Sequence, residues 1–432
     1  MNTPSEHDLI YDWNSHAGTI ADRKNPIELD DETLRDGLQN PSVTDPPVEK
    51  KFELLRLMSK LGIDAVNLGL PGAGARARAD ITLMAELIKD EKLGLFPNAA
   101  CRTVLADITP LIEIVQKTGV PIEAACFIGS SPIRQYAEDW TLDHIQKLST
   151  DAISYAVKNG LPVMYVTEDT TRSRPEDIRR LYTAAIEAGA RRICIADTTG
   201  HAMPYGVRNI VRFVRQIVAD TGVDVKIDWH GHSDRGLSVI NALAAIKAGV
   251  DRVHATGLGI GERVGNTPMD IMLVNLKLDG FIDRDLTPLS PYTQMVSDIC
   301  EVPLPHNYPI FGRDAFRTAT GVHAAAIIKA KNKGADWLAD RVYSGVPASM
   351  VGLKQKIEIG FMSGVSNIVY WLKEHGIEPE KQLVDEIFTA AKQHSRILTD
   401  DDVWNIVKYH RFENGTLPTD TLEEWKKQVV KK

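Results

Sequence analysis

Two histidines and several carboxylates stand close together near the middle of the chain, in the stretch DWHGHSD at residues 228–234. This stretch follows residues 223–227, whose alternating apolar pattern is typical of a β-strand. Because successive side chains of a strand point to opposite faces, His230 and His232 share one face. Two neutral imidazoles on one face can bind a metal ion, although the pair can also be two ordinary polar residues at a strand end.

The elements that must position these histidines form a repeating pattern. Short β-type runs are each followed by a stretch with helical periodicity. Alternation of this kind over about 250 residues favours a closed (β/α)8 barrel, and no G-x-G-x-x-G follows the first strand. Strands are expected at 27–34, 65–69, 94–97, 122–128, 162–166, 192–196, 225–230 and 252–254, and helices at 48–62, 142–160, 175–190, 203–222 and 236–250.

The chain changes character after the last of these strands. A proline-rich stretch predicts a linker, and the remainder has mainly helical patterns, at 312–334, 366–376, 380–398 and 421–432. We therefore expect a catalytic barrel followed by a helical C-terminal subdomain, or arm, that reaches a partner subunit. The expected parts are an N-terminal extension (1–25), the barrel (26–285), the linker (286–311) and the helical subdomain (312–432).

Composition narrows the class of protein. The 432 residues carry a net charge of −8, and no long run of Lys or Arg is present, which argues against nucleic acid as a partner. The four cysteines are widely spaced and indicate buried, reduced thiols. The N-terminus lacks a signal-peptide pattern, and no run of eighteen apolar residues occurs. We expect a soluble, cytoplasmic protein with no membrane contact.

Active sites of (β/α)8 barrels lie at the C-terminal ends of the strands, and polar residues gather at the predicted strand ends here. Asp36 is our choice for a carboxylate that completes an O,N,N ligand set with His230 and His232. Arg35 beside it could stabilise an alkoxide or enolate oxygen, although an Arg-Asp pair can also be purely structural. Other polar residues at these ends are Gln39, Asn67, Glu168, Thr198, Glu262, Arg263 and Asn266.

Three motifs carry a resemblance to a known family: DETLRDGLQNP at 31–41, HGHSDRGL at 230–237 and GIGERVGN at 259–266. In this order they resemble the aldolase-like metallolyase barrels, which include 2-isopropylmalate synthase, homocitrate synthase, citramalate synthase and hydroxymethylglutaryl-CoA lyase. The resemblance covers roughly residues 27–275 and continues into the helical part. It implies an acetyl-CoA-dependent acyltransferase of amino-acid biosynthesis that uses a divalent metal (Mn, Mg, Zn or Co).

The resemblance also implies roles for single residues. Asp36, His230 and His232 match metal ligands, Asn266 lies near or on the metal, and Arg35 matches the arginine that steadies the enolate. Gln39, Glu168 and Thr198 match substrate-pocket positions. Gly259 and Gly261 belong to a glycine loop near CoA. Glu262 and Arg263 are interpreted as a pair that orders this loop. His323 and Tyr343 match a pair that synthases take from a neighbouring subunit, which implies a homodimer with exchanged arms.

Two reactions compete for such a site. A synthase condenses acetyl-CoA with a 2-oxo acid, whereas a lyase cleaves a 3-hydroxyacyl-CoA by a retro-Claisen step. Lyases of the family carry a cysteine in the glycine loop, and residues 257–270 have none, which favours condensation. A CoA-independent metal aldolase and a noncatalytic barrel remain open as well. His323 with Tyr343 is our choice for the general base, with Glu168 as the second candidate.

The chain departs from the family's usual residues at Asn67, Ser233, Arg134 and Met164. Asn67 stands where a glutamate usually braces the arginine, so the bidentate anchor on Arg35 is lost. Met164 replaces a basic residue that homocitrate synthases use, which argues against 2-oxoglutarate as the substrate. Arg134 could supply that positive charge to the substrate, or could form a surface ion pair.

Overall fold

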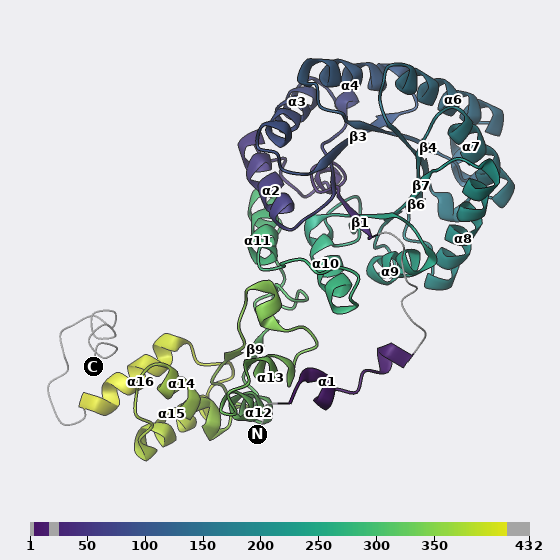
Figure 1. Ribbon diagram of the computed structural model, residues 1–432. Helices are drawn as coiled ribbons and strands as arrows, with labels where there is room; N and C mark the ends of the chain where they lie inside the picture. Colours follow the sequence, from purple (N-terminus) through teal and green to yellow (C-terminus); the bar gives the residue numbers. More distant parts are fainter. Residues whose placement is uncertain (1–3, 17–25, 413–432) are drawn as a thin grey trace. The chain divides into compact units, whose positions relative to one another are not determined.

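Eight parallel strands follow one another around a closed barrel, and β1 pairs with β8 to complete the ring (Figure 1). The computed structural model describes residues 4–16 and 26–412. It divides the chain into two units, residues 15–303 and residues 1–14 with 304–432. The barrel predicted from the sequence is confirmed. Its strands are β1 (Glu28–Asp31), β2 (Ala65–Asn67), β3 (Phe96–Arg102), β4 (Glu123–Gly129), β5 (Val163–Glu168), β6 (Arg192–Asp197), β7 (Lys226–Gly231) and β8 (Arg252–Ala255).

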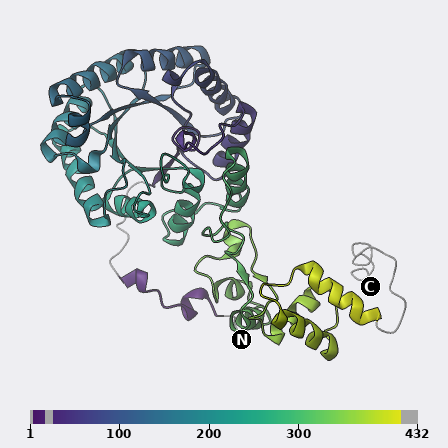
Figure 2. The ribbon, with the colours of Figure 1, turned by 180° about the vertical axis from the view of Figure 1, so that it is seen from behind.

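Helices surround the ring of strands on its outer side, as both ribbon views show (Figures 1 and 2). The five helices predicted in this part of the chain are present. Helices α3 and α4 are also present, although the sequence analysis did not name a helix in either range. The helices are α2 (Val48–Lys60), α3 (Ala75–Asp90), α4 (Leu105–Thr118), α5 (Pro132–Ala137), α6 (Leu142–Lys158), α7 (Pro175–Glu187), α8 (Pro204–Thr221), α9 (Ser238–Ala248), α10 (Met269–Leu278) and α11 (Leu289–Cys300).

Helix α11 lies in the stretch 286–311, where the sequence suggested a linker. Pro288 and Pro291 lie at its N-cap and in its first turn, where a missing backbone N–H costs no hydrogen bond. Tyr292 is fully buried, and its hydroxyl donates a hydrogen bond of 2.5 Å to Oδ2 of Asp31 on β1. Residues 289–300 therefore belong to the barrel unit.

The inside of the barrel contains buried charges that compensate one another. Arg252 is 1% exposed; its Nε donates to Asp228 at 2.7 Å and its Nη2 donates to Glu123 at 2.8 Å. Arg192 also donates to Asp228, at 2.7 Å. These pairs lower the pKa of Asp228 although burial alone would raise it. Charged groups thus form the layer beneath the strand ends.

The second unit combines short helices with a small parallel strand pair. Its helices are α1 (Glu6–Leu9), α12 (Gly321–Lys331), α13 (Asp336–Arg341), α14 (Val365–Glu374), α15 (Lys381–Gln393) and α16 (Asp400–Phe412). The helix predicted over 312–334 begins only at Gly321, because β9 (Arg317–Thr318) pairs with β10 (Lys356–Ile357). The predicted helix over 421–432 and residues 17–25 of the predicted extension lie outside the described residues.

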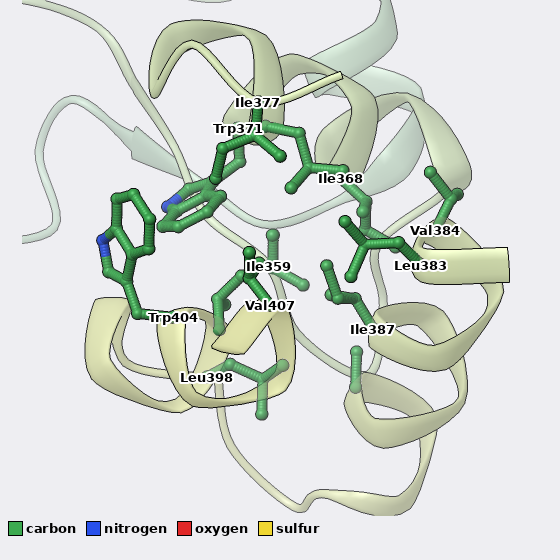
Figure 3. Close-up of a cluster of buried hydrophobic side chains, with 13 residues drawn as sticks. Ile359, Ile368, Trp371, Ile377, Leu383, Val384, Ile387, Leu398, Trp404 and Val407 are labelled. Carbon is green, nitrogen blue, oxygen red and sulfur yellow. The ribbon is translucent and has the colours of Figure 1, made fainter. Parts of the chain in front are cut away.

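This unit has an apolar core of its own, formed mainly by α14, α15 and α16 (Figure 3). The indole rings of Trp371 and Trp404 meet edge to face, with 5.4 Å between their centroids, and Ile368, Ile387 and Val407 are fully buried beside them. The separate core stabilises the unit by burial of apolar surface. Within the described parts of both units, every helix is too short or too polar to cross a membrane.

Candidate active site

Asp36, His230 and His232 meet at the C-terminal ends of β1 and β7. Oδ2 of Asp36 lies 3.5 Å from Nε2 of His230 and 3.6 Å from Nε2 of His232, and the two Nε2 atoms are 3.1 Å apart. All three residues are buried, with at most 8% of their surface exposed. His230 is the next-to-last residue of β7, so the strand's alternation does place both histidines on one face.

The spacing of these atoms fits one shared cation. Two ligand atoms at ~2.1 Å from an ion are separated by ~3.0 to ~3.4 Å in octahedral or tetrahedral geometry. The observed separations of 3.1, 3.5 and 3.6 Å are close to that range. Burial and the neighbouring His230 lower the pKa of His232 to about 4, so this imidazole is neutral and able to bind metal near pH 7.

Glu32, which was not among the site residues predicted from the sequence, orients one of the two histidines. Its Oε2 lies 2.7 Å from Nδ1 of His230 and accepts a hydrogen bond from it, which leaves the Nε2 lone pair directed at Asp36 and His232. Burial alone would raise the pKa of Glu32, but Arg35 and His230 hold it well below its usual value. One signal in the sequence could have predicted this role of Glu32: it is a carboxylate four residues before Asp36, in the same turn.

Arg35 is anchored by Glu32 rather than by a residue of β2. Its Nη2 donates to Oε1 of Glu32, and its Nη1 lies 3.1 Å from Oδ1 of Asp36. The amide nitrogen of Asn67 also contacts Oε1 of Glu32, at 3.5 Å, while its oxygen accepts from the backbone N–H of Gly69. Asn67 therefore does not anchor Arg35, and Glu32 contacts the guanidinium instead, from the turn after β1.

His254 of β8 completes the buried charge network behind Glu32. Its Nε2 donates to Asp228 at 2.9 Å, and its Nδ1 lies 3.3 Å from Oε1 of Glu32. Burial alone would lower the pKa of His254, but Glu32 and Asp228 raise it to about 10. This shift favours the protonated form of His254, whose charge compensates those of the two carboxylates.

Asn266 reaches the same cluster from the glycine loop after β8. Its Nδ2 donates to Oδ2 of Asp36, and its Oδ1 is buried without a hydrogen-bond partner. A buried, unpartnered oxygen beside Asp36 suits a position near or on a metal. Gly261 permits this approach, because a Cβ there would collide with Oδ1 of Asn266.

Arg263 ties three loops together at the rim of the barrel. It donates to Asp234 at 2.8 and 2.9 Å and to the carbonyl oxygen of Thr198. The direct ion pair of Arg263 is with Asp234 in the loop after β7, and the adjacent Glu262 adds a Coulombic interaction. The backbone of Gly259 has a positive φ of 66°, which lets the glycine loop turn back onto Asn266.

A cavity of about 340 Å³ opens beside the cluster and contains most of the sequence-predicted residues. Arg134 does not line it: this arginine lies 3.3 Å from Glu138 and 3.8 Å from Glu168, as an ion pair. Burial raises the pKa of Glu168. Gly259 and Gly261 shape the loop without lining the cavity. The predicted residues that line it are Arg35, Asp36, Gln39, Asn67, Glu168, Thr198, His230, His232, Glu262 and Arg263.

His323 and Tyr343 lie in the second unit, next to each other. Their rings stack with 4.0 Å between centroids and an interplanar angle of 27°. Both side chains are exposed, and Tyr343 is 49% exposed. The structure therefore brings the predicted pair together and leaves its surface open to another molecule.

The closed barrel with two imidazoles and a carboxylate at its strand ends is a (β/α)8 barrel with a candidate metal site. A family model described as HMGL-like matches residues 26–296, more than half of the chain. A homocitrate synthase AksA of Methanocaldococcus jannaschii is 32% identical over 88% of this chain and 90% of its own length. The chain belongs to the HMGL-like family, which confirms the resemblance of its motifs.

Two further comparisons bear on relatives and fold. A 2-isopropylmalate synthase of Halothermothrix orenii is 28% identical, over 92% of this chain and 79% of its own length. Among solved structures, the HMG-CoA lyase of Bacillus subtilis aligns with a TM-score of 0.54 and 20% identity, over 65% of this chain and 95% of that chain. At this identity the likeness supports the barrel fold alone.

Proposed function

We propose that the protein condenses acetyl-CoA with a 2-oxo acid and hydrolyses the product thioester, giving a 2-hydroxy dicarboxylic acid of the alkylmalate type and free CoA. The observation that carries this proposal is the convergence of Asp36, His230 and His232 beside Arg35 at one cavity. The names of the relatives, homocitrate synthase and 2-isopropylmalate synthase, support the same reaction class.

Different residues have different roles in the proposed reaction. Asp36, His230 and His232 would hold a divalent cation, which when bound would supply Lewis-acid polarisation of the keto oxygen. A base removes a proton from the acetyl methyl, and the resulting carbon attacks the keto carbon. Arg35 stabilises the developing enolate oxygen, since its guanidinium is held at the cavity by Glu32 and Asp36. Water then cleaves the thioester, and the thiol leaves as CoA-SH.

Two groups compete for the role of base. Glu168 lines the cavity, and burial raises the pKa of its carboxyl toward the range useful for proton transfer at neutral pH. His323 with Tyr343 is the other candidate, acting from a partner subunit. Loss of the acidic limb of the pH–rate profile in Glu168→Gln would assign the base to Glu168, and an unchanged limb would assign it to His323.

We also propose that the active form is a homodimer in which the second unit of one chain completes the cavity of its partner. The exposed, stacked rings of His323 and Tyr343 support this arrangement. Mixing inactive His323→Ala chains with inactive Asp36→Ala chains should restore part of the activity, because mixed dimers contain one intact site. No recovery after subunit exchange would contradict the shared site.

The thiol-release assay tests the reaction itself. Full-length protein loaded with Mn²⁺ is given acetyl-CoA and a panel of 2-oxo acids, and CoA-SH is followed with a thiol reagent. Release that depends on both substrates and stops with chelator supports condensation. Cleavage of hydroxymethylglutaryl-CoA without condensation would instead identify a retro-Claisen lyase, and pyruvate release without CoA would identify a metal aldolase.

A further inference from the structure

The cavity has two unlike halves. The half formed by β1, β2, β7 and β8 holds the charged cluster around Asp36 and His230. The opposite half comes from β3 to β6 and, apart from Glu168 at the end of β5, is lined by apolar or weakly polar side chains. We call this surface the β3–β6 wall; it consists of Ala100, Ala125, Phe127, Met164, Val166 and Cys194.

Strand register makes the β3–β6 wall continuous. Ala100 pairs with Ala125, and Ala125 with Met164, so one row of the wall runs across three strands. Val166 pairs with Phe127 and with Cys194 in the next row. Ala125, Met164 and Cys194 also pack against one another as a buried cluster. A substrate group that extends away from the metal ligands would therefore meet apolar surface.

The guanidinium of Arg252 lies beneath the β3–β6 wall, and carboxylates already neutralise its charge. Nη2 of Arg252 lies 3.4 Å from Sδ of Met164, but Arg252 does not line the cavity. Its guanidinium donates hydrogen bonds to Asp228 and Glu123. Met164 thus separates the cavity from this charge, and the Nε and Nη2 groups of Arg252 already donate to carboxylates.

The rim of the same half carries a negative charge, which disfavours a second carboxylate on the substrate. Among the described residues that line the cavity from β3 to β6, the one with a charged side chain is Glu168. A second carboxylate on the substrate would face this anion and an apolar surface, which is strongly unfavourable. Arg134 pairs with Glu168 and is shared with Glu138.

We propose that the 2-oxo acid substrate has an uncharged, aliphatic side chain, which packs on the β3–β6 wall while its 2-oxo and carboxylate groups face Arg35 and the metal ligands. This inference rests on the proposed function and names its substrate class. The volume of about 340 Å³ must also hold the acetyl group of acetyl-CoA, which favours short linear or branched chains over aromatic ones.

The test compares acids of similar shape and different charge on the Mn²⁺-loaded full chain. The panel is 2-oxobutyrate, 3-methyl-2-oxobutyrate and 4-methyl-2-oxopentanoate against oxaloacetate and 2-oxoglutarate. We expect kcat/KM for the best aliphatic acid to exceed that for both dicarboxylates by roughly 100-fold or more. The same acids, added without acetyl-CoA, should raise the Tm, and the dicarboxylates should raise it less.

Variants of the wall distinguish this inference from the general function. Ala125→Val should move the preference toward shorter side chains, and Met164→Ala toward longer ones, with changes of roughly 10-fold per methylene; Met164→Leu, which conserves volume, should retain the native order. A preference for a dicarboxylate that disappears in Arg134→Ala would overturn the inference and leave condensation intact. Aliphatic acids that raise the Tm without CoA release would support the inference and overturn condensation. Failure of every acid to bind or react would overturn both.

Discussion

Oε2 of Glu32 lies 2.7 Å from Nδ1 of His230, so a carboxylate of β1's turn fixes the tautomer of an imidazole on β7. The same carboxylate binds Arg35 through its other oxygen. One buried side chain therefore aligns a proposed metal ligand and the proposed enolate-stabilising group. We propose that Glu32 takes the positioning role that the resemblance assigns to a glutamate at the end of the second strand, where this chain has Asn67.

Replacing Glu32 tests this positioning role. Glu32→Gln keeps the size of the side chain but removes the charge that orients His230, so we expect Mn²⁺ affinity to fall roughly 10- to 100-fold. Calorimetric titration of chelator-stripped protein measures the change. Asp31→Asn is the matched control, because Asp31 is equally buried but bonds to Tyr292 on the other face of the strand. Equal affinities for the wild type and Glu32→Gln would contradict the role.

Arg35 should contribute to the chemical step more than to binding. Arg35→Lys retains a positive charge but loses the two-pronged contact with Glu32 and Asp36. We expect kcat to fall roughly 100-fold, with a smaller change in KM, as measured by CoA release. Arg56→Lys, in an exposed pair with Glu91, serves as the control. A large rise in KM at constant kcat would show that Arg35 only binds substrate.

Arg252 should be a structural requirement of the barrel. Arg252→Met leaves Asp228 and Glu123 buried without this partner, and we expect a loss of about 3–5 kcal/mol in the free energy of unfolding. Urea denaturation followed by circular dichroism measures it. Arg180→Met removes the exposed contact with Asp143 and should cost at most about 1 kcal/mol. Similar losses in the two variants would argue against a special role for the buried network.

The protonation of Asp31 should make the free energy of unfolding depend on pH. Burial raises its pKa from 3.8 to about 6, so the folded state binds this proton more tightly than the unfolded state. The favourable contribution of the protonated group is fully present below pH 3.8 and is lost as the pH rises through about 6, which amounts to about 3 kcal/mol. The unfolding free energy of Asp31→Asn should therefore decline less than that of the wild type between pH 4 and 7. Parallel curves for the two proteins would disprove the shift.

The sequence predicted the barrel and the ligand cluster because both depend on local patterns. Alternating apolar runs located all eight strands, and the two-residue spacing of His230 and His232 placed them on one face. Strand ends of a closed parallel barrel must meet, so the proximity of Asp36 followed from topology. Helix α11 was missed because its prolines resemble those of a linker until their position in the first turn is known.

Contacts between distant loops were harder to predict. The partner of Arg263 is Asp234, 29 residues away on another loop, rather than the adjacent Glu262. Glu32 was assigned to the predicted strand at 27–34 and was not recognised as a site residue, although its alternation with Asp30 places its side chain inside the barrel. His254 belongs to a strand of only four residues, where a period of two is difficult to recognise.

Metal titration tests the central claim most directly. Chelator-stripped, full-length protein should bind one Mn²⁺ per chain at the Asp36, His230 and His232 cluster, as measured by calorimetry and electron paramagnetic resonance. The double variant His230→Ala/His232→Ala should lose this binding while retaining the circular dichroism of the barrel, and His144→Ala on α6 should bind as the wild type does. Unchanged stoichiometry and affinity in the double variant would contradict the claim that these residues hold the metal.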